Sequence, residues 1–141
     1  MRCKAVVLAA SLAALPVVAG CSNSSCKTGT LLLHLALLDD APLADTITVV
    51  GNDPGAAVSQ SFPHTPNPDA AALRIERTAV VVTWPGGYPV HAIVGLTVTA
   101  LSGATVVGSD ISSVRLDDKC TETSVLVSNR YHEAGDGGAG Q

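Results

Sequence analysis

The sequence predicts an all-β domain, a sandwich of two antiparallel sheets with about seven strands. Short runs rich in Val, Leu, Ile and Thr are separated by Gly, Pro, Asn and Asp, a pattern that favours strands over helices. Residues 93–101 give the clearest period-two signal, with aliphatic side chains on one side and Thr97 and Thr99 on the other. A small barrel is the alternative architecture.

In the first half of the domain, strands are expected at residues 28–38, 45–50 and 57–62. The first of these runs is almost entirely apolar and contains His34. Residues 51–55, Gly-Asn-Asp-Pro-Gly, form a turn signal that ends the second run. Residues 63–69 contain three prolines, which cannot donate to a sheet ladder, so an irregular exposed loop is expected there.

In the second half, strands are expected at residues 73–76, 79–84, 93–101, 104–107 with an extension to 111, and 121–128. The run at 79–84 is β-branched almost throughout, which is typical of a strand covered on both faces. Residues 84–89 form a tight turn, and 102–103 form another. The Gly-rich end of the chain, 131–141, is expected to be a disordered tail.

The N-terminal segment has the parts of an export signal. Arg2 and Lys4 precede an apolar run at residues 5–18, which is too short to span a bilayer as a helix. Val18-Ala19-Gly20-Cys21 closes this segment and resembles the bacterial lipobox, in which the cysteine is lipidated before cleavage. An ordinary secretory signal with a chance cysteine is the alternative.

The lipobox resemblance implies that residues 1–20 are a cleaved lipoprotein signal peptide. It also implies that Cys21 carries the lipid and that residues 21–25 are a tether. In lipoproteins of two-membrane bacteria, which this chain resembles, Ser rather than Asp after the lipidated cysteine permits export to the outer membrane, and Ser22 stands at that place. The expected location is therefore the cell envelope, on the outer membrane, facing either the periplasm or the exterior.

The cysteines of the chain divide between the signal and the domain. In the lipoprotein interpretation, Cys3 is lost with the signal and Cys21 takes the lipid. Cys26 and Cys120 remain as an even pair in an exported chain, so a disulfide between them is expected. A metal site is disfavoured because the four histidines are scattered singly, without the close pairing usual in zinc sites.

Seven or eight short strands within residues 26–130 fit a two-sheet sandwich of the immunoglobulin or fibronectin type III kind. Cys26 stands just before the first expected strand and Cys120 just before the last. A bond between them brings the starts of these two strands together. The first and last strands should therefore run side by side, parallel or nearly so.

Size and charge exclude several classes of function. Removal of residues 1–20 leaves 121 residues, enough for one domain and short tails. That mature chain has six basic and twelve acidic side chains and a net charge of −6 with His neutral. This balance argues against nucleic acid as a partner, and it leaves the lipid rather than a basic patch as the membrane anchor.

Few residues suggest a binding or catalytic site. The sequence has no Gly-x-Ser-x-Gly elbow, Gly-rich phosphate loop or His-Glu-x-x-His motif. Asp39, Asp40 and Asp45 lack the spacing of a calcium loop and read as turn residues. Trp84 and Tyr88 are a candidate recognition loop for a glycan or protein, although core packing is the better interpretation of the only Trp.

Residues 84–89 and 96–101 look similar to segments of small lipoproteins of myxobacteria and related bacteria, as does the placement of Cys26 and Cys120 around the strands. This resemblance implies an immunoglobulin-like fold and no particular activity. The expected function is a lipid-anchored structural or interaction module of the envelope, without catalysis or a cofactor. Its expected partners are the membrane and an envelope protein or glycan. The alternative is an envelope hydrolase or metal-dependent accessory enzyme whose site forms only in three dimensions.

Overall fold

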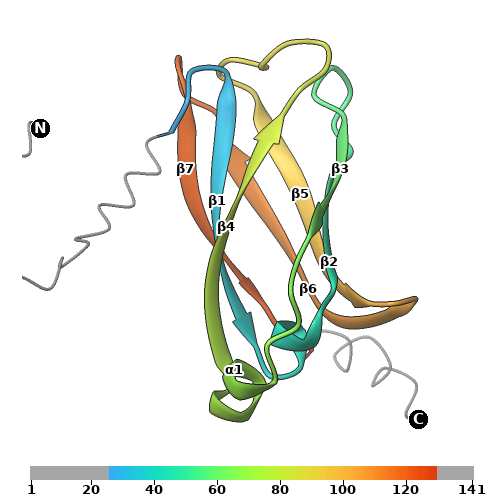
Figure 1. Ribbon diagram of the computed structural model, residues 1–141. Helices are drawn as coiled ribbons and strands as arrows, with labels where there is room; N and C mark the ends of the chain where they lie inside the picture. The colour runs from blue at the N-terminus through green and yellow to red at the C-terminus, as the bar shows by residue number, and fades with distance from the viewer. Residues whose placement is uncertain (1–25, 130–141) are drawn as a thin grey trace, which may run out of the picture.

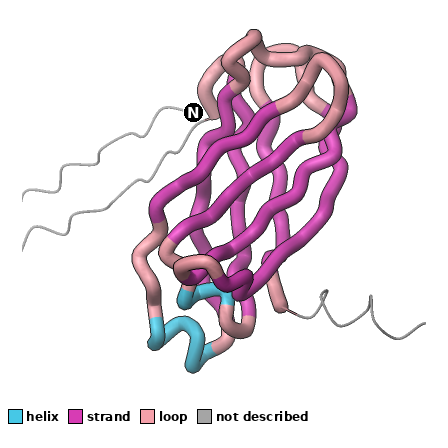
Figure 2. The backbone as a smooth tube through the Cα atoms, turned by 90° about the vertical axis from the view of Figure 1, so that its right-hand side faces the viewer, coloured by secondary structure: helices cyan, strands magenta, loops and turns pink. Residues whose placement is uncertain are grey.

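The computed structural model describes residues 26–129, and seven strands and two short helices lie within them. The expected signal peptide at 1–20, the expected lipidation site Cys21, the expected tether at 21–25 and the expected tail at 131–141 lie outside the described residues. The described chain folds into two sheets packed face to face on one hydrophobic core (Figures 1 and 2).

The smaller sheet has the order β4-β1-β7. It consists of β1 (Thr30–Leu38), β4 (Ile75–Thr83) and β7 (Thr121–Val127). The central strand β1 pairs antiparallel with β4 and parallel with β7. The larger sheet has the order β3-β2-β5-β6, and all its pairs are antiparallel. Its strands are β2 (Thr46–Gly51), β3 (Val58–Pro63), β5 (Ile93–Ser102) and β6 (Thr105–Arg115).

The all-β sandwich with seven strands is confirmed. Its strand order differs from that of an immunoglobulin constant domain, in which the first strand lies beside the second. Here β1 lies between β4 and β7, and β2 belongs to the other sheet. Between β1 and β2 the chain therefore passes from one sheet to the other, through the short 3-10 helix η1 (Ala41–Leu43).

The core is almost wholly aliphatic because each central strand turns alternate side chains inward. Leu31, Leu33, Leu35 and Leu37 of β1 are at most 2% exposed. In β5 the predicted alternation is confirmed, with buried residues at 94, 96, 98 and 100. Side chains from the two inner faces meet between the sheets, and their burial is the main favourable term in folding.

The disulfide between Cys26 and Cys120 is confirmed, with a Cα–Cα separation of 5.9 Å. It joins the chain just before β1 to the chain just before β7. These two strands run parallel and adjacent from Leu31, opposite Thr121, to Leu37, opposite Val127. The predicted proximity of the first and last strands is therefore correct.

Both short helices, η1 and α1, are absent from the sequence prediction. The helix α1 (Pro68–Leu73) occupies part of the predicted irregular loop and of the predicted strand at 73–76. The side chain of Asn67 accepts a hydrogen bond from the Ala70 N–H, and Pro68 occupies the first turn, where its missing donor costs nothing. Arg74 ends the helix in the left-handed conformation, with φ of 62°.

Candidate functional site

The outward face of the smaller sheet carries a histidine near its centre, with charged and apolar side chains around it. Even-numbered residues of β1 point outward because the odd-numbered leucines fill the core. His34 stands at the middle, opposite Ala79 of β4 and Ser124 of β7. We call this surface the β1 face, and it comprises Leu32, His34, Ala36, Arg77, Ala79, Val81, Glu122, Ser124 and Leu126.

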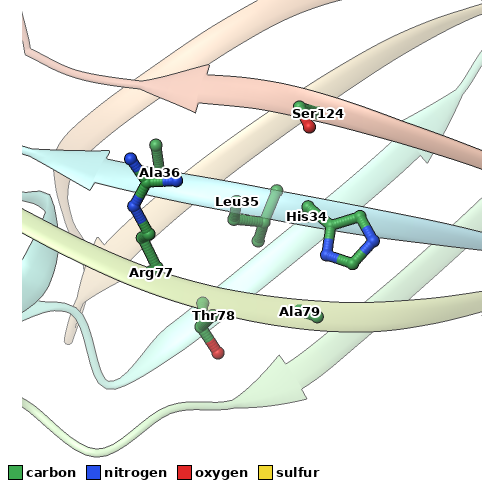
Figure 3. A pocket seen from close by; sticks show the side chains of 7 residues that line it. All are labelled: His34, Leu35, Ala36, Arg77, Thr78, Ala79 and Ser124. Atoms are coloured by element: carbon green, nitrogen blue, oxygen red, sulfur yellow. The ribbon is translucent and has the colours of Figure 1, made fainter. Parts of the chain in front are cut away.

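A shallow hollow of about 450 Å³ lies on the β1 face (Figure 3). Small side chains make this depression, because Ala36, Ala79 and Ser124 leave space beside the larger His34 and Arg77. Arg77 lies opposite Ala36 in the sheet register. The hollow therefore arises from the small size of these side chains, and the sheet beneath it is regular.

Charged groups stand on opposite edge strands of the β1 face. Glu122 on β7 lies beside His34, with 3.8 Å between His34 Nε2 and Glu122 Oε2. Both side chains are about half exposed, so this contact contributes at most about 1 kcal/mol. On β4, Arg77 is exposed and has no ion-pair partner among residues 26–129. The face is thus positive along β4 and negative along β7.

Apolar side chains complete the β1 face and extend it toward one end. Val81 is 42% exposed, Leu126 is 47% exposed, and Ile75, at the start of β4, is 43% exposed. On a regular sheet these residues share one flat surface with Ala36 and Ala79. A mixed surface of this kind, with apolar groups around a few charges, is typical of protein contact sites.

Ser124, His34 and Glu122 are residue types that occur in hydrolytic triads, but their geometry is different. In the described chain Ser124 and His34 form no hydrogen bond, and the His34–Glu122 distance of 3.8 Å exceeds hydrogen-bond length. The backbone of β1 is paired with a strand on either side, so its N–H groups in the ladder serve the sheet and not an oxyanion.

Trp84 is a core residue, in agreement with core packing as the better interpretation of the only Trp, and it is not an exposed recognition residue. Its side chain is 8% exposed, and the indole N–H donates to the Ala56 carbonyl at 2.9 Å. The ring of Tyr88 packs edge-on against it, with centroids 5.6 Å apart, and the Tyr88 hydroxyl bonds to Thr121 at 2.7 Å. The two rings close the end of the core beside the disulfide.

His64, in the loop after β3, has a largely buried imidazole. Its side chain is 8% exposed, and Nδ1 donates to the Ala44 carbonyl at 2.7 Å, since a carbonyl only accepts. Its Nε2 lies 3.2 Å from Oε1 of Glu76, the second residue of β4. The pair joins the two sheets near the open edge between β3 and β4. His91 remains on the surface, 2.7 Å from Asp118.

The three aspartates weighed as a calcium loop do not form a common site: Asp39 and Asp40 lie in the turn after β1, and Asp45 lies just before β2. The Asp45 carboxylate accepts hydrogen bonds from the Gly103 N–H at 2.7 Å and the Thr46 hydroxyl at 2.8 Å. These two bonds hold the pKa of Asp45 below its ordinary value, with the Gly103 bond the larger cause. Asp40 instead accepts from Asn129 at 3.2 Å, so the aspartates do not converge on one point.

Comparison with known proteins gives no assignment for this chain. No family model, curated protein or solved structure matches it. Within residues 26–129, no group of three or more His, Cys, Asp or Glu side chains is placed to hold a metal ion. In the same residues, no helix has the length and apolar character needed to cross a bilayer.

Proposed function

We propose that this chain is a lipid-anchored structural or interaction module of the bacterial envelope, and that the β1 face is its contact surface. The observation that carries the proposal is the β1 face itself, a flat, regular sheet on which Val81 and Leu126 are exposed. Beside them lies Arg77, which has no ion-pair partner among residues 26–129. Exposed apolar groups with a few oriented charges suit a protein partner, since they supply both buried area and register.

Anchoring is supported by the sequence around Cys21 and by the position of Cys26. Five chain steps separate these cysteines, which limits their distance to about 18 Å. Because Cys26 is bonded to Cys120, a lipid on Cys21 keeps this end of the sandwich close to the bilayer. Figure 1 shows α1 and the β5–β6 hairpin at the opposite end. Ser22 supports the outer membrane as the location.

The surface chemistry favours binding over catalysis. The hollow on the β1 face is shallow and lies on an ordered sheet, and its Ser124 has no hydrogen-bonded base among the described residues. A protein partner is also favoured over a glycan. Sugar recognition commonly uses an exposed ring, and the chain's only Trp is in the core.

Lipidation is tested by mass spectrometry of the N-terminal peptide from protein made with an intact export pathway. The expected peptide begins at Cys21 and carries acyl chains, and the protein fractionates with the outer membrane. A Cys21→Ser variant is the control and is expected in the soluble envelope fraction. An unmodified Cys21 in correctly exported protein would overturn the anchor.

The contact function is tested by chemical cross-linking in intact cells, with mass spectrometry of the captured species. The anchored protein is expected to give a defined protein adduct. The Cys21→Ser form should give less of it, because loss of the anchor lowers the local concentration at the membrane. Recovery of the uncross-linked chain alone from both forms would contradict an interaction role.

A further inference from the structure

We propose that the partner on the β1 face is the same face of a second copy of this chain. This inference rests on the proposed contact function and names its occupant. Arg77 lies on β4 opposite Ala36, two residues after His34, and Glu122 lies on β7 opposite Leu32, two residues before it. The two charges therefore occupy the ends of one diagonal, with His34 at its centre.

The apolar side chains occupy the other diagonal. Val81 lies on β4 opposite Leu32, and Leu126 lies on β7 opposite Ala36. Both are exposed, at 42% and 47%. A line through Val81, His34 and Leu126 thus crosses the line through Arg77 and Glu122 at the middle of the face.

This arrangement is self-complementary about a two-fold axis that lies in the face along the apolar diagonal. Rotation about that axis brings the face against its copy, with Val81 and Leu126 each meeting their own equivalents. Arg77 then meets Glu122 of the second copy, and Glu122 meets the second copy's Arg77, as a two-fold interface requires. The sheets cross steeply in this packing, which is one of the two usual ways in which sheets pack.

The same axis suits two copies anchored in one membrane. Val81 is nearer than Leu126 to the end of the sandwich that carries Cys26, because it lies opposite Leu32 near the start of β1. A two-fold rotation about the line joining them leaves the Cys26 ends of both copies on the same side. Both lipids therefore enter one bilayer.

Charge balance explains why the copies meet at this face. The mature chain has a net charge of −6, so two copies repel over most of their surfaces. On the β1 face the positive charge of Arg77 balances the negative charge of Glu122, so this face carries no net repulsion. When two copies pair, Arg77 of each copy contacts Glu122 of the other, which gives two attractive contacts between opposite charges. Arg77 lacks an ion-pair partner within residues 26–129, so the second copy supplies it.

The test is analytical ultracentrifugation of the mature chain made without lipid by Cys21→Ser, at concentrations up to about 1 mM, the weak end of specific association. The wild-type face is expected to give a reversible dimer. Arg77→Glu and Glu122→Arg should each raise the dissociation constant about tenfold or more, because each variant sets like charges against each other. An equimolar mixture of the two variants should recover dimers, since their faces are complementary.

Arg115→Glu is the matched control, because Arg115 is an exposed arginine at the end of β6 in the other sheet. It should leave dimerisation unchanged. A monomeric wild-type chain throughout this range would overturn the proposal, and so would a mixture that associates no better than either variant. Neither result concerns the lipid anchor or capture of a different protein in cells, so failure of this proposal is distinguishable from failure of the proposed function.

Discussion

Trp84 is an aromatic residue of a type common at recognition sites, but in this protein its side chain belongs to the core. Its ring fills the end of the sandwich, and its N–H satisfies the Ala56 carbonyl. Trp84→Phe removes that donor and leaves a small cavity. We expect a loss of about 2 kcal/mol in the free energy of unfolding.

Urea unfolding followed by far-UV circular dichroism measures this loss, because the variant has no Trp to report by fluorescence. In the wild type, emission from the only Trp should be blue-shifted when folded and should move to longer wavelength on unfolding. Emission typical of a solvated indole in the folded protein would contradict the buried position.

Asp45 makes the stability of the folded protein depend on pH in the acid range. Its pKa is lowered in the folded state by hydrogen bonds from Gly103 and Thr46. The resulting stability is present above the ordinary value of 3.8 and is lost as the pH falls through the lower folded value. Thermal unfolding between about pH 2 and 7 should therefore show that Asp45→Asn has a shallower acid dependence than the wild type. Parallel curves would contradict this role.

Between elements, the largely buried pair of His64 and Glu76 connects the chain after β3 to β4. His64→Ala leaves the Glu76 carboxylate without its partner, and we expect a loss of about 3 kcal/mol. This is the low end for a buried pair, because the Glu76 side chain is still 19% exposed. Adding Glu76→Leu should restore part of the stability.

Chemical denaturation of the single and double variants makes this comparison. His91→Ala is the control, since His91 and Asp118 form an exposed pair and its loss should cost less than about 1 kcal/mol. If His64→Ala proved no more costly than His91→Ala, the pair would not link the two sheets.

The disulfide constrains the parallel pair of β1 and β7. It closes a loop with a sequence separation of 94, for which the chain-entropy model gives about 4 to 5 kcal/mol. The Cys26→Ala/Cys120→Ala variant should lose stability of this order in urea unfolding. The wild type should approach the variant when reductant is added. Equal midpoints for oxidised and reduced wild type would contradict a stabilising role.

The elements differ in how far sequence predicts them. β5 is recognisable because its alternation of buried and outward residues is local and uninterrupted. Helix α1 is not predicted because it has only six residues and begins at the last of three prolines that mark a loop. Its start could have been found from Asn67 followed by Pro68, a cap and first-turn pair.

At the scale of the whole molecule, the β1 face depends on pairing between distant segments. Arg77 and Glu122 lie on strands that flank β1 but are far from it in the chain, so their place on one face follows only from strand order and register. The sandwich, the disulfide and the parallel first and last strands follow from local periodicity and cysteine position. The diagonal arrangement of Arg77 and Glu122 could not be predicted from these local features.

In the proposed function, one end of the sandwich is anchored and the β1 face along its side makes the contact. Cys26 and the paired starts of β1 and β7 mark the end toward the proposed lipid on Cys21, and the β1 face runs along the side of the sandwich (Figure 1). In the proposed function, a sheet held near a bilayer by this lipid presents the β1 face to other molecules in the same membrane.

The most direct test of this claim is site-specific photo-cross-linking in living cells. A photoreactive residue replaces Leu126 on the β1 face or, as the control, Ile111, which is 79% exposed on the outer face of the other sheet. The account predicts a defined protein adduct from position 126 and none from position 111. No adduct at 126, or the same adduct from both positions, would contradict the β1 face as the contact surface.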